Sequence, residues 1–311
     1  MENVDLDPLT YLIDYIFEEL PEGAELKYID AQKIFYLTQQ RLDADNRVAQ
    51  SLPFYWYIHG PMSKAVSYSL NTAKQEGIID GQTTPTAGQV YTPGQTDPPE
   101  IEEDEDLERA KEAIDEVLEE YDIFSDLDER LRDDIYVDAP YDFQLYYKFE
   151  VLPAIEEFAG EHYIVTHPPD EIQFRLARAE AKFPTNPAFN ECGHLFSRFI
   201  TLAETYLEEV DESEKRAVET FEQLATDAWE LFAKRLRIEE HDDEYDDDVD
   251  SWELEYNSSL QSFDSDLRSF EVTLNEQYDL YDDPSEESVR ISEDSAWGVV
   301  NSSLLEENRP E

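Results

Sequence analysis

The chain contains little cysteine and little glycine, and each scarcity excludes a class of structure or chemistry. Cys192 is the only cysteine among 311 residues, so no intrachain disulfide can form and a reducing cytoplasm is expected. The nine glycines form neither a G-x-x-x-x-G-K phosphate loop nor a G-x-G-x-x-G dinucleotide motif, and the zinc motif H-E-x-x-H is missing. The sequence therefore predicts a non-enzymatic protein with no catalytic residues, no cofactor and no metal.

Long apolar runs are missing as well. No stretch approaches the roughly 18 apolar residues that a membrane-spanning helix needs. The acidic sequence MENVDLDPLT lacks the basic region that opens a signal peptide. We therefore expect a soluble, cytoplasmic protein without a membrane partner.

Basic side chains are scarce: 23 Lys and Arg stand against 77 Asp and Glu, which gives a net charge of −54. This composition resembles that of proteins from haloarchaea, which keep molar salt in the cytoplasm. In molar salt, charges are screened over about 3 Å, so the negative charge neither repels DNA at long range nor steers cationic partners. Local surface chemistry must then decide what the protein binds.

One stretch contains no acid at all. From Asn46 through Gln75, thirty consecutive residues contain neither Asp nor Glu. Such a stretch is either buried or forms a surface that must stay free of negative charge. On the helix expected over residues 64–75, the polar positions form a candidate recognition surface of Lys64, Ser67, Asn71, Thr72, Lys74 and Gln75. Burial of this surface under a second domain is the alternative.

The N-terminal part of the chain mixes helix and strand signals. Apolar spacing predicts helices over 9–20, 26–42 and 64–75, and an aromatic strand over 54–58 that ends at the breaker pair Gly60 and Pro61. Strands are expected to start at 78–79 and to return at 89–92, around a loop at 81–88. This order is that of a winged-helix unit with the loop as its wing, so residues 1–94 are expected to form a winged-helix-like domain.

The stretches LKYIDAQKIFYLTQQ, PFYWYIHGPMSKAVSYSL, EGIID and YTPG resemble the signature of the YwgA-like proteins and of the Panacea domain of SocA-like antitoxins. In this chain the closing turn of that signature is compressed to Tyr91, Thr92, Pro93 and Gly94. The resemblance implies a winged-helix-like fold in a regulatory or toxin-neutralising protein, and it implies no catalytic residues.

The rest of the chain is expected to be helical, so the whole protein is predicted to be mainly α. Residues 95–106 read as an acidic linker, 107–282 as a helical domain whose stretch 141–158 is broken at Pro153, and 283–311 as a mobile acidic tail with a short docking segment at 297–305. Two long amphipathic stretches, 218–238 and 252–281, predict a helical hairpin. The apolar spacing of the second is heptad-like, so a homodimer through the 252–281 helix is the competing arrangement.

A second acid-poor region covers residues 172–203. It contains two acids, Glu180 and Glu191, and a secondary surface of four bases is expected there: Arg175, Arg178, Lys182 and Arg198.

Three further features carry weaker chemical signals. The zinc or thiol-imidazole candidates are Cys192, His194, His162 and His167, with a buried thiol and incidental histidines as the alternative. The loop 242–253 has acids spaced as in a calcium-binding EF-hand, but Asp247 stands where that loop needs glycine, and a solvated acidic turn is the alternative. His59, at the end of the aromatic strand, is either a functional donor or a structural side chain.

These observations leave three functional hypotheses. The first is a non-enzymatic regulatory or adaptor protein whose N-terminal unit recognises a protein partner, as the antitoxin-like resemblance implies. The second is sequence-specific DNA binding by the helix 63–76, with Asn71 and Gln75 reading bases. DNA ranks second because residues 82–95, which contain the expected wing, have no Lys or Arg to contact phosphates. The third, an enzyme that uses Cys192 or a metal, has the least support.

Overall fold

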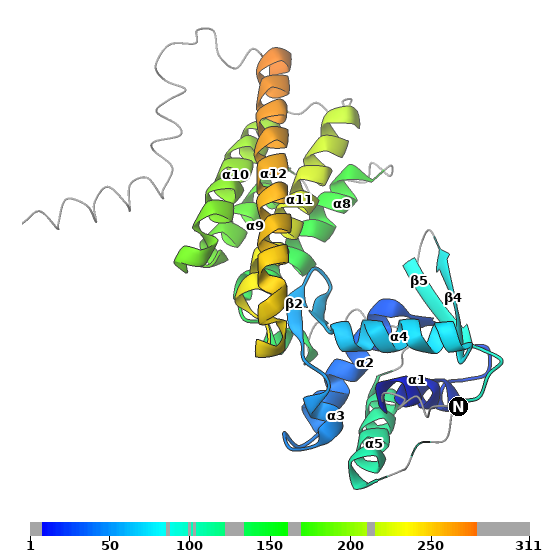
Figure 1. Ribbon diagram of the computed structural model, residues 1–311. Coiled ribbons are helices and arrows are strands. Elements are labelled where there is room, and N and C mark those ends of the chain that lie inside the picture. Colours follow the sequence, from blue (N-terminus) through cyan, green and yellow to red (C-terminus); the bar gives the residue numbers. More distant parts are fainter. Residues whose placement is uncertain are drawn as a thin grey trace, which may run out of the picture. The chain divides into compact units, whose positions relative to one another are not determined.

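The computed structural model describes residues 8–84, 88–98, 101, 104–121, 134–160, 169–209 and 215–278. Most of these residues are helical, and the strands form a small antiparallel sheet and a separate β-hairpin (Figure 1). The mainly α prediction is therefore confirmed. Within the described residues, no helix combines the length and the apolar character needed to cross a lipid bilayer.

Backbone contacts divide the chain into two compact units. Unit 1 consists of Met1–Ala139 and Leu236–Val249, and unit 2 consists of Pro140–Arg235 and Asp250–Glu311. The division differs from the one expected at residues 95–106, because helix α5 (Glu105–Glu120) packs against α1 and α2 of unit 1. A short segment from far along the chain also returns to unit 1.

Unit 1 contains helices and strands in the following chain order. They are α1 (Pro8–Glu19), β1 (Leu26–Lys27), α2 (Tyr28–Arg41), α3 (Arg47–Gln50), β2 (Tyr55–Tyr57), β3 (Gly60–Met62), α4 (Lys64–Glu76), β4 (Ile79–Thr84), β5 (Gly88–Pro93) and α5. The antiparallel sheet has the strand order β1-β5-β4, with Leu26 opposite Tyr91 and Ile79 opposite Pro93. Buried side chains from the helices and the sheet, including Leu12, Phe35, Leu70 and Tyr91, form its core.

Local sequence explains where α4 begins and ends. Ser63, in an extended conformation, precedes the helix. Gly77 ends it in the left-handed conformation (φ 76°), which glycine adopts without strain. The expected helix 64–75 is therefore found at α4.

Two local expectations for unit 1 were wrong, and one was incomplete. The aromatic strand ends before Gly60 and Pro61 as expected, but residues 60–62 also form β3, which pairs with β2. Residues 26–27 are a strand rather than a helix start, because they pair with Tyr91 and Val90 at the edge of the sheet. Most of the expected loop 81–88 belongs to β4 and β5, and residues 85–87 lie outside the described residues.

Unit 2 is a helical assembly with an aromatic core. Its main elements are α7 (Asp142–Tyr146), the π-helical turn η2 (Tyr147–Val151), α8 (Leu152–Ala159), α9 (Pro169–Lys182), η3 (Pro187–Phe189), α10 (Asn190–Glu209), most of α11 (Lys215–Glu239), and α12 (Val249–Tyr278). Rings of Phe143, Phe183 and Phe232 meet at centroid distances of 4.6 to 5.6 Å. The expected break at Pro153 is not found, because Pro153 lies in the first turn of α8 directly after the wide turn η2, where its missing N–H is tolerated.

The heptad-like face of α12 is buried inside unit 2. Phe263, Leu267, Phe270 and Leu274 are each at most 2% exposed. Phe263 and Phe270 meet aromatic rings of α10, and α12 lies beside α10 and α11 (Figure 1). These four positions are therefore occupied within the chain, whereas Leu260 of the same face is half-buried. The homodimer through this helix stays a prediction. Tyr281, the last residue of the expected seam, lies outside the described residues, as do the tail 283–311 and the expected docking segment 297–305.

Candidate functional site

Helix α4 has one buried face and one exposed face. Val66, Leu70 and Ala73 are fully buried against unit 1. Positions 64, 68, 71 and 75 lie on the opposite side, because spacings of four, three and four residues return to the same face of a helix. All four of these side chains are exposed, and the ring of Tyr68 is 68% exposed. We call Tyr68, Asn71 and Gln75 the outer face of α4.

The structure separates the six predicted recognition residues into groups. Lys64, Asn71, Lys74 and Gln75 are exposed, and Thr72 is half-buried at the border of the outer face. Ser67 is turned toward the interior of unit 1 and is also half-buried.

Hydrogen bonds hold Ser67 in this position. Its hydroxyl lies 2.6 Å from the hydroxyl of Tyr28, accepts from Gln32 Nε2 at 3.0 Å and donates to the Ser63 carbonyl at 2.9 Å. These bonds tie the Ser67 hydroxyl to α2 and to the residue that precedes α4.

Lys74 lies beside the sheet. A Cβ placed on Gly81 of β4 would lie 3.1 Å from Lys74 Cδ and 3.2 Å from Lys74 Nζ. Such contacts are tighter than usual, so glycine at this position gives the lysine side chain room to cross β4. Lys74 thus joins the C-terminal end of α4 to the β4–β5 hairpin.

An acidic segment covers the other end of α4. Nine of the twelve residues 239–250 are Asp or Glu, and residues 240–248, which we call the acidic strap, pack within unit 1. Lys64 Nζ lies 2.5 Å from a carboxylate oxygen of Asp248. The most acidic segment of the described chain therefore lies against the acid-free stretch.

Backbone hydrogen bonds attach the acidic strap to β2. Trp56 N donates to the Glu240 carbonyl and Asp242 N donates to the Phe54 carbonyl, both at 3.2 Å, around an antiparallel bridge between Tyr55 and His241. In addition, Phe54 N donates to the Asp242 carboxylate at 2.6 Å. The strap thus pairs with the edge of β2 through one isolated antiparallel bridge.

Tyr245 anchors the acidic strap. Its side chain is only 4% exposed, its hydroxyl donates to the Pro53 carbonyl at 2.9 Å, and it accepts from Lys64 N at 2.9 Å. The ring meets Tyr55 edge to face at a centroid distance of 5.1 Å. Burial raises the pKa of this phenol.

The contacts of the acidic strap bear on the calcium hypothesis. The carboxylates of Asp242 and Asp248 bind donors of the protein itself, and residues 243–248 form a 3-10 helix. In the described part of the chain, no three or more His, Cys, Asp and Glu side chains are grouped to hold a metal ion.

His59 is exposed at the turn of the β2–β3 hairpin.

The bases of the second acid-poor region contact groups of their own unit. Arg175 pairs with Glu150 and Glu171, and Lys182 pairs with Asp142. Arg178 lies over the ring of Tyr146, at 5.1 Å from its centroid. These three bases follow one side of α9.

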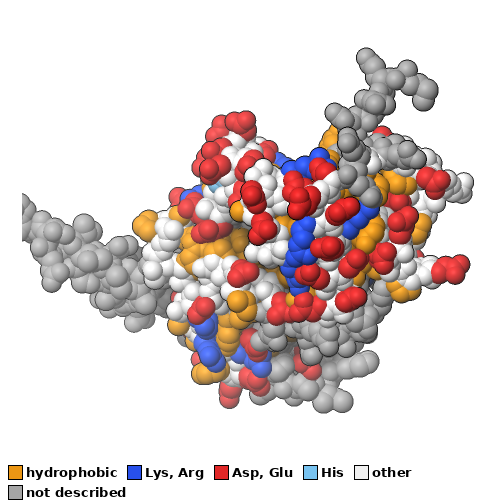
Figure 2. All heavy atoms as spheres, turned by 90° about the horizontal axis from the view of Figure 1, so that it is seen from below, with side chains coloured by type: hydrophobic (Ala, Val, Ile, Leu, Met, Phe, Trp, Pro, Cys, Tyr) orange, Lys and Arg blue, Asp and Glu red, His pale blue; other side chains and the backbone are white. Residues whose placement is uncertain are grey.

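The fourth base, Arg198, lies on α10 and binds acids of α12. Its guanidinium lies 2.8 Å from Asp264 and 2.6 Å from Glu271. Figure 2 shows, on the face that it displays, Lys and Arg side chains with Asp and Glu side chains beside them. The structure thus does not join the four bases into one free cationic surface.

Cys192 and His194 do not form a catalytic pair. They lie two residues apart on α10, and such residues point to different sides of a helix. The Cys192 thiol is buried, donates to the Phe189 carbonyl at 3.3 Å, and has its pKa raised by burial to about 12, whereas His194 is exposed. A protonated, buried thiol is a poor nucleophile. His162 and His167 lie outside the described residues.

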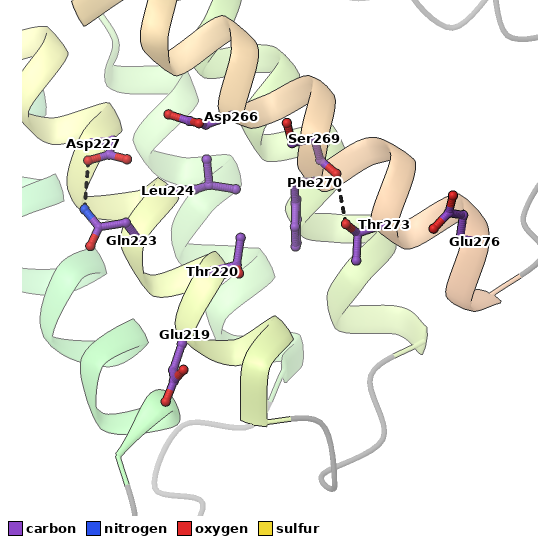
Figure 3. Close-up of a pocket in the computed structure, with 10 residues that line it drawn as sticks. All are labelled: Glu219, Thr220, Gln223, Leu224, Asp227, Asp266, Ser269, Phe270, Thr273 and Glu276. Carbon is purple, nitrogen blue, oxygen red and sulfur yellow. Dashed lines mark hydrogen bonds between the residues drawn. The ribbon is translucent and has the colours of Figure 1, made fainter.

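Unit 2 also contains an acidic groove between α11 and α12, with a volume of about 800 Å³. Figure 3 shows Asp227 of α11, bonded to Gln223, and Asp266, Ser269 and Phe270 on α12. Burial raises the pKa of Asp227, and the nearby Asp266 adds to the shift. The groove has hydroxyl and carboxylate groups, and none of its ten lining residues is basic.

Sequence reasoning missed Tyr68 and the acidic strap. Tyr68 is not among the six predicted recognition residues, although its spacing from Lys64 and Asn71 places it on the exposed side. The composition of the strap does give a signal, because the segment richest in acids complements the stretch that contains none. Nothing in the local sequence, however, indicates a contact between residues 188 positions apart.

Comparisons with known proteins do not add a family to this description. No protein-family model matches the chain, and neither the curated proteins nor the solved structures searched give a match. The function must therefore be argued from the chemistry of the site itself.

Proposed function

We propose that this chain is a non-enzymatic regulatory or adaptor protein whose unit 1 recognises a protein partner through the outer face of α4. The observation that carries the proposal is Tyr68, which is 68% exposed between the neutral amides Asn71 and Gln75. Tyrosine is enriched among the residues that dominate protein interfaces, whereas Asp and Glu are depleted there. In a chain where about one residue in four is acidic, a neutral face around an exposed aromatic ring suits a protein interface.

A winged-helix-like fold for unit 1 belongs to the same proposal. It is supported by β1 between α1 and α2, by α4 before the β4–β5 hairpin, and by the strand order β1-β5-β4. The resemblance to the YwgA-like and Panacea proteins, and a cytoplasm rich in salt as the working environment, are proposed on the sequence features alone.

DNA recognition by the same helix is the second candidate. It is favoured by Asn71 and Gln75, exposed amides of the type that reads adenine edges. Two observations weigh against it, because Lys64 is already paired with Asp248 and the described residues of β4 and β5 contain neither Lys nor Arg. Phosphate contacts usually need such bases.

Affinity purification from the native host tests the proposal. The tagged chain is captured in molar potassium chloride, and bound proteins and nucleic acids are both identified. We expect a protein that wild type retains and the Tyr68→Ala variant loses. The matched control is Phe174→Ala, because Phe174 is an exposed ring of similar accessibility (65%) on unit 2.

Two outcomes would contradict the proposal. If the Tyr68→Ala variant retains every protein that wild type retains, the outer face of α4 is not the recognition surface. If the bound material consists of DNA of defined sequence and is lost on nuclease treatment, the second candidate replaces the first.

A further inference from the structure

We infer that the edge of β2 and the first turn of α4 form a binding site for an extended acidic peptide with an aromatic side chain, and that the acidic strap occupies this site within the same chain. The inference rests on the proposed function for the existence of a protein partner, and it names a partner class: an acidic segment with an aromatic anchor. Three sets of contacts carry it.

The first set is the backbone ladder. Phe54, directly before β2, and Trp56 of β2 offer an acceptor and a donor to a neighbouring chain, and Asp242 and Glu240 use them at 3.2 Å. Addition of a strand to a sheet edge is a general mode of peptide recognition, in which main-chain hydrogen bonds supply affinity without regard to sequence. This edge therefore accepts an extended peptide.

The second set is a socket for an aromatic side chain. Tyr55 supplies a ring to the Tyr245 ring, the Pro53 carbonyl accepts its hydroxyl proton, and Lys64 N donates to the same oxygen. A buried phenol with both a donor and an acceptor for its hydroxyl is recognised specifically, because loss of either bond would leave a polar group unsatisfied. The socket therefore selects tyrosine among aromatic residues.

The third set is electrostatic. The strap brings Asp242 to Phe54 N and Asp248 to Lys64 Nζ, and the residues 46–75 around these contacts contain no acid that would repel it. The absence of acids from this stretch thus has a cause in the fold. A competing peptide needs the same chemistry: an extended backbone, a tyrosine, and carboxylates on both sides of it.

Because the strap is part of the chain, it competes at a high effective concentration, of the order of millimolar for short tethers. An external acidic peptide therefore binds well only when the strap is weakened or displaced. The strap acts as an internal competitor that keeps the site closed.

A peptide with the sequence of residues 239–250 tests this inference directly. It is labelled and titrated against the full-length chain, as wild type and as the Tyr245→Ala variant, in molar potassium chloride. We expect the Tyr245→Ala chain to bind the peptide at least about tenfold more tightly than wild type, since its own strap no longer fills the socket. The control peptide, in which the tyrosine is replaced by alanine, should lose that binding.

Equal affinity of the two folded chains for the peptide would overturn the inference. If circular dichroism shows that Tyr245→Ala does not fold, the milder Asp248→Asn chain takes its place and should bind the peptide about threefold more tightly than wild type. Unchanged affinity there would overturn the inference as well.

The Tyr68→Ala chain separates this inference from the proposed function. It should bind the peptide as wild type does, because Tyr68 lies on the outer face of α4 rather than on the β2 edge. Loss of the co-purified protein in Tyr68→Ala, together with no peptide binding to either strap variant, overturns only the strap inference. Peptide binding to the strap variants without any effect of Tyr68→Ala on co-purification overturns only the proposed function.

Discussion

Two stretches of this chain contain few acids, and the structure uses them in different ways. On α9 and α10, Arg175, Lys182 and Arg198 form ion pairs with carboxylates of unit 2. On α4, the acid-free stretch is covered by the acidic strap at Lys64 and exposed at Tyr68. The same compositional signal therefore has three physical outcomes: bases used for packing, a surface covered by a returning segment, and a neutral exposed face.

A stretch without acids therefore indicates that a region is special, but it does not distinguish packing from recognition. In a chain with few bases, most bases find carboxylates nearby, and such pairs fix helices against one another. Recognition is better indicated by exposed side chains that are neither acidic nor engaged in packing. On this criterion α4 is the stronger candidate, and the following predictions test the distinction.

The largest expected effect concerns Arg198. An Arg198→Glu substitution places a third carboxylate beside Asp264 and Glu271 at a site where the arginine side chain is only 27% exposed. We expect the free energy of unfolding, measured with denaturant in molar salt, to fall by about 2–3 kcal/mol. Arg268→Glu is the control, because Arg268 pairs with the same Asp264 while 69% exposed and should change stability by less than about 1 kcal/mol. If Arg198→Glu has the same free energy of unfolding as wild type, the ion pairs of Arg198 do not stabilise unit 2. Arg198 would then again be a candidate recognition residue.

A smaller effect separates Ser67 from Asn71 within the acid-free stretch itself. Ser67→Ala removes the hydroxyl that Tyr28 and Gln32 contact, and should lower the free energy of unfolding by about 1 kcal/mol. Asn71→Ala changes an exposed side chain and should stay within about 0.5 kcal/mol of wild type. Thermal unfolding of the two variants in parallel measures the contrast, and equal losses would mean that Asn71 is packed as well.

Helix α1, which packs against α4, contains a carboxyl group whose contribution to stability depends on pH. Burial, with help from Glu18 and Asp97, raises the pKa of Asp14 from 3.8 to about 6. The folded protein therefore holds this proton more tightly than the unfolded chain does, so the contribution of Asp14 to stability increases as the pH falls from about 6 to about 4.

The Asp14→Asn variant checks this dependence. It should be more stable than wild type at neutral pH, and its advantage should disappear as the pH falls through that window. Because the carboxyl is partly exposed, the difference should stay below about 1 kcal/mol. A constant difference between the two proteins from pH 7 to pH 4 would show that Asp14 does not titrate in this range.

The elements with strong local signals were predictable from the sequence. Helix α4 lies between Ser63 and Gly77 as their capping preferences indicate, and the buried face of α12 follows its apolar spacing. The exposed positions Asn71, Lys74 and Gln75 of the candidate site were predicted as well, because polar residues opposite an apolar face lie at the surface.

Features that depend on distant partners were not predictable. The strand Gly60–Met62 contains a proline and is stabilised by pairing with β2 rather than by its own propensity. Ser67 is polar and lies at the border of the exposed face, so only its bonds to Tyr28 and Gln32 show that it is turned inward. The acidic strap meets β2 across most of the chain, and a local pattern contains no information on such a pairing.

The smallest expected change in stability belongs to the outer face of α4, and it carries the sharpest test of function. The double variant Asn71→Asp and Gln75→Glu adds two carboxylates at exposed positions, where this chain normally places acids. Its free energy of unfolding should therefore stay within about 0.5 kcal/mol of wild type. Its partner should nevertheless be lost, because carboxylates are costly to desolvate in an interface whose other side was built against neutral amides. Thermal unfolding and co-purification, both in molar potassium chloride, measure the two quantities on one sample. A stable variant that keeps its partner would exclude Asn71 and Gln75 from the interface, and a loss of several kcal/mol would mean that this face is buried rather than free to bind.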